Sequence, residues 1–179
     1  MTDQSTSPVS FVVDVRRLPE KGFPVVIEAD ERQRAALAQA HGLVSVEQFD
    51  AQLTVSAWKR DGVAVRGRVR AAIVQSCVVT LEPVPAEIDE PVEALFLPPD
   101  SPLARPSYQD GELFLSAEGT DAPDVLEGHS IDVGAIAEEI FGLAIDPYPR
   151  SSGAAAAMQD DTVDPASPFA GLADRLRRH

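Results

Sequence analysis

The sequence has few of the residues from which proteins build metal sites and disulfides. Its 179 residues include one cysteine, Cys77, and three histidines that are far apart, His41, His129 and His179. A structural zinc site needs about four Cys or His ligands at close spacing, and one cysteine cannot form an internal disulfide. The histidines are better explained as helix-end or solvated groups. The composition therefore predicts no metal and no cofactor.

Motifs of nucleotide-binding and hydrolytic enzymes are also missing. The chain has no Walker loop, no Gly-x-Gly-x-x-Gly loop and no Gly-x-Ser-x-Gly elbow. Glu138 and Glu139 are adjacent, and adjacent helix residues point about 100° apart, so they are not expected to converge on one substrate. We therefore predict that the chain is not an enzyme and has no catalytic residues.

Long hydrophobic runs are absent as well. No run approaches the ~20 apolar residues that a membrane-spanning helix needs. Residues 1–10 have neither the basic nor the apolar part of a signal peptide. Together with the single cysteine, these features predict a cytoplasmic protein with no membrane partner.

Positive charge is scarce and unevenly distributed. Fifteen Lys and Arg face 29 Asp and Glu, which gives a net charge of -14. In residues 82–139, one arginine, Arg105, against fifteen acidic residues gives -14, so the remaining residues balance to zero. An acidic protein is in general a poor partner for nucleic acid, but here the basic residues are gathered outside the acidic segment.

Three of these basic residues alternate along one predicted strand. Arg66, Arg68 and Arg70 occupy every second position, so a strand would point all three to one face. Like charges on one face repel each other unless an anion lies across them. The other face would receive Val63, Val65, Val69 and Ala71. Two further basic residues, Lys59 and Arg60, and the only tryptophan, Trp58, precede the strand. The candidate RNA-binding residues are Trp58, Lys59, Arg60, Arg66, Arg68 and Arg70.

Two interpretations of these residues stay open. In the first, the cations hold RNA phosphates and Trp58 stacks on an exposed base. In the second, Trp58 packs in the core or covers the sheet edge, and the arginines pair with acids on the following strand. Candidates for such pairing are Glu87, Asp89 and Glu93.

Hydrophobic periodicity predicts an α+β fold, with an antiparallel, twisted β-sheet and helices packed on one side. Strands are expected over 11–15 and 23–27, followed by a meander around a three-strand core at 51–97. Asp61-Gly62 between two alternating runs is a strong hairpin signal. We expect the second core strand to continue to Cys77 and Val79, with Cys77 as a small buried hydrophobic residue.

Two helices are predicted inside the domain. Asp30 and Gln33 have the spacing of a capping box, and Gly42 suits the end of that helix. For the second helix, Ser130 is the expected N-cap, with Asp132 in the first turn and Pro147 after the end. Its expected buried stripe consists of Ile136, Ile140, Leu143 and Ala144.

The expected domain organisation has four parts. Residues 1–8 are a disordered lead, 9–149 a single α+β domain, 150–166 a flexible linker and 167–179 a short C-terminal helix. Inside the domain, residues 107–128 are expected to be a mobile flap or a short edge strand. The last helix, with Phe169 on its apolar edge, either folds back on the sheet or binds a partner.

Several segments resemble one known family in their order and spacing. They are CVVTLEPV at 77–84, IDVGAIAEEI at 131–140, AIDPYP at 144–149 and SPFAGL at 167–172. The chain resembles the YceD family, the bacterial large-ribosomal-RNA-subunit accumulation proteins. The residues that carry the resemblance are Cys77, Leu81, Pro83, Ile131, Asp132, Glu138, Glu139, Pro168 and Phe169.

The resemblance implies a role in the synthesis, processing or stability of large-subunit ribosomal RNA, with no known enzymatic activity. Many members carry a Cys-x-x-Cys where this chain has Cys77 and Thr80, and a further cysteine after the helix that here ends near Pro147. This chain lacks both additional cysteines. A metal- or thiol-based function is therefore not expected here.

The expected function is that of a non-enzymatic ribosome-biogenesis factor that binds ribosomal RNA or a pre-ribosomal particle. The alternative is an acidic adaptor that docks a basic ribosomal protein through residues 82–139. The sequence leaves the oligomeric state open.

Overall fold

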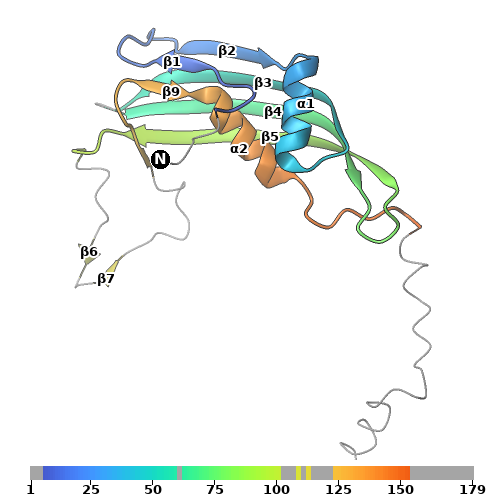
Figure 1. Ribbon diagram of the computed structural model, residues 1–179. Coiled ribbons are helices and arrows are strands. Elements are labelled where there is room, and N and C mark those ends of the chain that lie inside the picture. Colours follow the sequence, from blue (N-terminus) through green and yellow to red (C-terminus); the bar gives the residue numbers. More distant parts are fainter. Residues whose placement is uncertain (1–5, 60–61, 102–107, 110–111, 114–122, 154–179) are drawn as a thin grey trace, which may run out of the picture.

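The computed structural model describes residues 6–59, 62–101, 108–109, 112–113 and 123–153 (Figure 1). Within these residues, the helices are α1 (Glu31–His41) and α2 (Val133–Ala144). The strands are β1 (Val12–Asp14), β2 (Phe23–Glu28), β3 (Ser45–Trp58), β4 (Gly62–Ser76), β5 (Pro83–Leu97), β6 (Tyr108–Gln109), β7 (Glu112–Leu113), β8 (Asp124–Val125) and β9 (Ser130–Asp132). Neither described helix is long or apolar enough to cross a bilayer.

The main sheet has five strands in the order β2-β3-β4-β5-β8. Strands β2 to β5 are antiparallel neighbours, and β8 pairs in parallel with the end of β5. The pairs β1–β9 and β6–β7 form two further small antiparallel sheets. The α+β fold and the antiparallel meander across 51–97 are therefore confirmed. The parallel β8 is an edge strand inside the segment for which a flap or an edge strand was expected.

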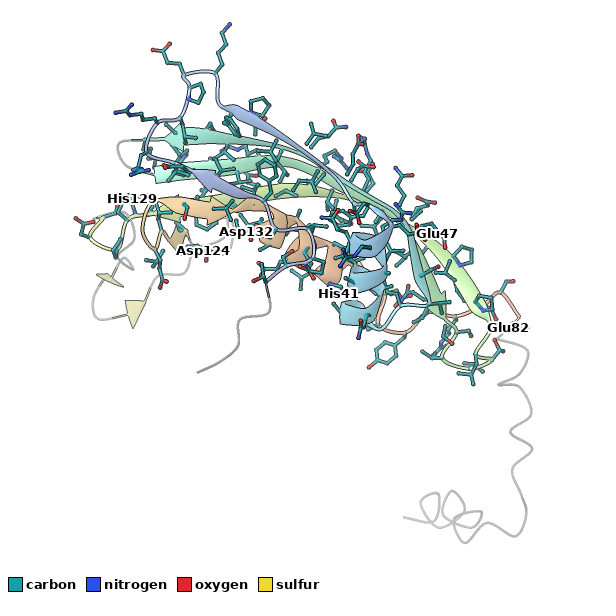
Figure 2. The ribbon with its side chains drawn as sticks, turned by 45° about the horizontal axis from the view of Figure 1, so that its top comes forward. His41, Glu47, Glu82, Asp124, His129 and Asp132 are labelled. Atoms are coloured by element: carbon teal, nitrogen blue, oxygen red, sulfur yellow. The ribbon has the colours of Figure 1, made fainter. Side chains whose placement is uncertain are left out.

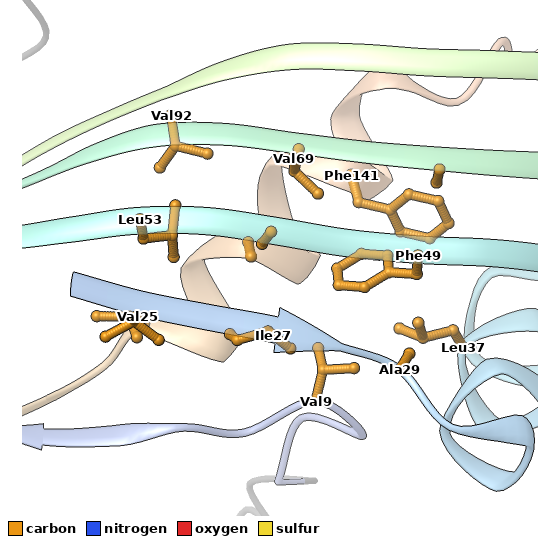
Figure 3. Packing of buried hydrophobic residues seen from close by; sticks show 14 of the residues in the cluster. Val9, Val25, Ile27, Ala29, Leu37, Phe49, Leu53, Val69, Val92 and Phe141 are labelled. Carbon is orange, nitrogen blue, oxygen red and sulfur yellow. The ribbon is translucent and has the colours of Figure 1, made fainter.

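Both helices and the β1–β9 pair lie on one face of the main sheet, here called the inner face (Figure 1). Buried residues of β2, β3 and β4 alternate along each strand and meet the helices there. The rings of Phe49 and Phe141 meet edge to face with centroids 5.4 Å apart (Figure 3). The opposite, outer face carries no helix among the described residues.

Two glycines allow backbone segments to approach closely. A Cβ added at Gly67 would lie 1.9 Å from the carbonyl oxygen of Gln52 on β3. At Gly134, at the start of α2, it would lie 1.9 Å from the carbonyl oxygen of Val9. The N-terminal segment therefore crosses the helix at a point where only glycine fits.

The first helix is capped as the sequence predicts. Asp30 accepts a hydrogen bond from the Gln33 amide, and the Gln33 side chain accepts one from the Asp30 amide. Gly42 follows the helix with φ of 65°, a left-handed conformation that glycine adopts at low cost.

Three local predictions are wrong. The N-cap of α2 is Asp132, whose side chain accepts from the amides of Gly134 and Ala135, while Ser130 belongs to β9. Leu143 is 77% exposed, because the buried side of α2 is centred on Ala137 and Phe141. Strand β4 ends at Ser76, so Cys77 lies in the following turn and not in the strand. Its burial is confirmed.

Candidate functional site

Arg66, Arg68 and Arg70 all project from the outer face of β4. The three side chains are exposed, whereas Val63, Val65, Val69 and Ala71 between and beside them are buried on the inner face. The predicted alternation is therefore confirmed. Because β4 lies in the middle of the main sheet, neighbouring strands provide side chains on both sides of these arginines.

Each of the three arginines pairs with a carboxylate on β5. Arg66 Nε lies 3.1 Å from Glu93 Oε1, and Arg68 Nε lies 2.7 Å from Asp89 Oδ1. Arg70 Nε lies 3.5 Å from the same Asp89 oxygen. The register explains these pairs, because Arg66 faces Glu93 and Arg70 faces Asp89 across the two strands. The hydrogen bond from Arg68, with the nearby positive charges, keeps the pKa of Asp89 below its usual value.

Carboxylates outnumber arginines on the described part of this outer face. Asp50 on β3 lies directly opposite Arg70, and Glu28 on β2 lies opposite Asp50. With Glu87, Asp89 and Glu93 on β5, five carboxylates face the three arginines of β4. Glu47 and Arg34 line the same hollow as Arg70 and add one charge of each sign, so the net charge is -2. The ion-paired side chains are about half exposed, and exposed pairs of this kind add little to stability. The arginines are therefore neutralised but remain accessible.

Trp58, at the hairpin end of the sheet, is half buried against neighbouring strands. A Cβ added at Gly62 would lie 2.9 Å from the Trp58 ring and 3.0 Å from Leu97. The Lys59 ammonium lies 4.2 Å from the centroid of the Trp58 ring. The geometry thus matches the second interpretation, in which this tryptophan covers the sheet. Arg60 lies outside the described residues.

A hollow at the same end was not predicted from the sequence. It has a volume of about 800 Å³ and lies between the loop after β1, the end of β5 and the segment after β8. Arg16, Arg17, Glu127 and His129 line it together with apolar residues. Arg16 pairs with Asp14, which it holds at a pKa of about 2, so part of the positive charge is compensated internally.

The turn after β4 is held by the sulfur of Cys77. The Sγ atom accepts from the amides of Thr80, at 3.4 Å, and Ser151, at 3.3 Å. Hydrogen bonds from Thr80 and Ser151 lower the pKa of the buried Cys77 thiol to about 6. The Thr80 and Ser151 hydroxyls also lie 3.3 Å apart. Among the described residues, no three His, Cys, Asp or Glu side chains come together as metal ligands.

A family model described as "Large ribosomal RNA subunit accumulation protein YceD" matches residues 65–174. The match spans more than half of the chain. The chain belongs to the YceD family. No curated protein and no solved structure matched it.

Most described YceD motif residues have structural roles. Asp132 caps α2 and accepts hydrogen bonds from the Ser10 hydroxyl and the Phe11 amide. Burial raises the pKa of Asp132, but these hydrogen bonds and those from the helix amides outweigh it, so the pKa is lowered.

Other YceD motif residues join the elements or lie at the surface. Glu138 Oε1 lies 3.2 Å from Nε2 of His41. Figure 2 labels His41 on α1. Ile131 is buried in β9, and Pro83 begins β5. Leu81 is 77% exposed. Pro168 and Phe169 lie outside the described residues.

Proposed function

We propose that this YceD family member supports accumulation of the large ribosomal subunit RNA as a protein-interaction adaptor in the cytoplasm. Its acidic surface docks a basic protein of the pre-ribosomal particle. The observation that supports this proposal is the distribution of charge on the outer face. All three arginines of β4 are paired there, and carboxylates of β2, β3 and β5 leave the described face with a net negative charge.

Charge on the whole chain favours the same type of partner. A net charge of -14 repels the phosphates of RNA and attracts a basic protein, and long-range attraction raises the rate of encounter. The family description names accumulation of an RNA subunit and no reaction, which is compatible with a binding role.

Direct contact with ribosomal RNA is the second candidate. It is favoured by the three accessible guanidinium groups, which point in a common direction. Their ion pairs are half exposed and therefore weak enough for phosphates to replace the carboxylates. Lys59, whose ammonium lies over the ring of Trp58 at the hairpin end, would extend such a surface. On this candidate, affinity for RNA falls steeply with salt, because bound phosphates release counterions.

Purification of the tagged chain from cells, with and without RNase, separates the two candidates. The adaptor proposal predicts that a basic ribosomal protein remains bound after RNase treatment. It also predicts that a Glu87→Gln, Asp89→Asn, Glu93→Gln variant loses this protein, whereas a variant with Arg66, Arg68 and Arg70 changed to Gln retains it. Release of every partner by RNase, together with loss of binding in the arginine variant, would overturn the adaptor proposal in favour of RNA contact.

A further inference from the structure

Several segments that carry exposed hydrophobic side chains are joined by hydrogen bonds near the end of the domain with Glu82. This end lies opposite to the end with His129 (Figure 2). The side chains come from the turns after α1 and β4, from the last turn of α2 and from the segment that follows it. We call this group the apolar end. Its members are Val44, Val78, Val79, Leu81, Leu143 and Tyr148.

Hydrogen bonds and a ring contact hold these segments together. The amide of Val78 donates to the carbonyl of Pro149, next to Tyr148, and the amide of Val44 donates to Val74 at the end of β4. His41, near Val44, packs edge to face on Phe141 of α2, two residues before Leu143. The apolar side chains therefore belong to segments that meet at one place.

Leu81 is the most informative member of the apolar end. Its φ is 62°, in the left-handed region that disfavours residues with a side chain, and its side chain is 77% exposed. Glycine or asparagine would suit this backbone better. A leucine in this conformation strains the backbone, and its exposed side chain contributes no burial energy to offset the strain unless another surface covers it.

The chain leaves the described region beside the apolar end. Ser151 is hydrogen-bonded to Cys77 and Thr80 in the turn that carries Leu81. The family match continues past Gly153 to residue 174 and so includes Phe169 and Leu172. Fifteen residues lie between Gly153 and Phe169, and the fully extended chain that joins the two residues reaches up to about 55 Å. The connection is therefore long enough for residues 167–178 to return to the apolar end.

Sequence and charge also favour this segment as the occupant. Phe169, Leu172 and Leu176 are spaced three and four apart, so the helix expected from the sequence would place them on one side. Arg175, Arg177 and Arg178 lie beside this stripe in the sequence. Glu82 and Asp146 belong to the segments that form the apolar end, which also carry one cation, Arg150. An apolar stripe with basic neighbours thus complements an apolar surface with acidic ones.

We propose that residues 167–178 dock on the apolar end of the same chain, with Phe169 and Leu172 covering Leu81, Leu143 and Tyr148. Because the two parts are tethered, the segment is present at an effective concentration in about the millimolar range, so modest contacts suffice. A partner that binds either surface more tightly would displace the segment. This inference does not depend on whether the outer face binds protein or RNA.

Photo-crosslinking of the full chain tests the proposal. A benzophenone amino acid replaces Phe169, and equal amounts of ¹⁴N- and ¹⁵N-labelled chains are mixed before irradiation, so that mass spectrometry separates links within one chain from links between chains. The expected result is links within one chain to residues 78–81, 143 and 148. Links only between chains would assign the apolar end to a second copy and overturn the proposal, as would links spread over the whole domain.

A pair of variants gives a second readout without the crosslinker. In Leu81→Asn, the left-handed backbone is relieved but the apolar contact is lost, so amides at 143–148 should exchange with deuterium about tenfold faster as the segment dissociates. Val26→Asn is the matched control, because Val26 is also exposed but lies on β2, and it should leave this exchange unchanged. Equal exchange in Leu81→Asn and the control would refute the docking.

Discussion

The two faces of strand β4 contribute differently to the stability of the domain. On the inner face, Val65 and Val69 are completely buried beneath the helices. On the outer face, Arg66 and Arg68, each adjacent in sequence to one of these valines, form half-exposed ion pairs with β5. Burial of apolar surface stabilises a fold in proportion to area, whereas exposed ion pairs contribute little. The inner face therefore maintains the domain, and the outer face is free to serve a partner.

The largest expected effect lies on the inner face at Phe141. Its fully buried ring contacts Phe49 and His41 edge to face, so Phe141→Ala leaves a cavity between α2 and the sheet. We expect a loss of about 3–5 kcal/mol in the free energy of unfolding, measured by urea denaturation. A loss below about 1 kcal/mol would mean that the inner face does not hold the domain together.

A direct comparison of the two faces uses the neighbours Val69 and Arg68. Val69→Ala removes two buried methyl groups and should cost about 2 kcal/mol from lost burial and the cavity. Arg68→Ala removes an exposed ion pair and should lower the free energy of unfolding by only a small fraction of the loss in Val69→Ala. The midpoints of urea unfolding for the two variants provide the measurement. Equal losses would contradict the division of roles between the faces.

These predictions rest on features that differ in how well the sequence predicts them. The strand period of two placed the three arginines on one face and Val63, Val65, Val69 and Ala71 on the other, as the structure shows. For the arginines the sequence offered Glu87, Asp89 or Glu93 as alternative partners, and the structure shows pairs with Asp89 and Glu93. The capping box at Asp30 is local and was also predictable. In each case, residues near in sequence or in an adjacent strand decide the outcome.

Other features depend on contacts between distant segments. Helix α2 turns Phe141 inward because Phe49 and His41 are there to receive it, so its buried side could not be read from its own residues. Asp132 caps the helix while accepting from Ser10 and Phe11, which are distant in sequence. The hydrogen bond from the Ser151 amide to Cys77 Sγ also joins residues that are far apart in sequence.

The N-cap of α2 should show an intermediate effect that depends on pH. Asp132→Ala removes the acceptor for two helix amides and for the N-terminal segment, at a cost of about 1–2 kcal/mol at pH 7. Because the pKa of Asp132 is lowered in the folded protein, its charge stabilises the fold above the unfolded pKa of about 4, and this part is lost as pH falls through the folded pKa.

Asp132→Asn keeps an acceptor without the charge. Acidification should therefore destabilise the wild type more than Asp132→Asn, as followed by urea unfolding at several pH values. If both proteins lose the same free energy on acidification, the carboxylate is not the group that couples α2 to the N-terminal segment.

The smallest effect on stability is expected at Asp89. Asp89→Asn should leave the urea midpoint nearly unchanged, because the side chain is exposed and its bonds to Arg68 and Arg70 lie at the surface. It should nevertheless change binding, since two arginines lose their carboxylate. A large loss of stability would show that these ion pairs maintain the sheet and are not a surface open to a partner.

The central claim, that carboxylates and not arginines of the outer face hold the partner, is tested most directly by titrating two purified variants. One has Arg66, Arg68 and Arg70 changed to Gln, and the other carries Glu87→Gln, Asp89→Asn and Glu93→Gln. Each is titrated at fixed salt against a basic large-subunit ribosomal protein and against large-subunit ribosomal RNA. We predict that the arginine variant binds the basic protein more tightly than the wild type does, and that the carboxylate variant binds it at least about tenfold more weakly. The opposite order for the protein, with RNA bound tightly by the wild type and lost in the arginine variant, would contradict the account.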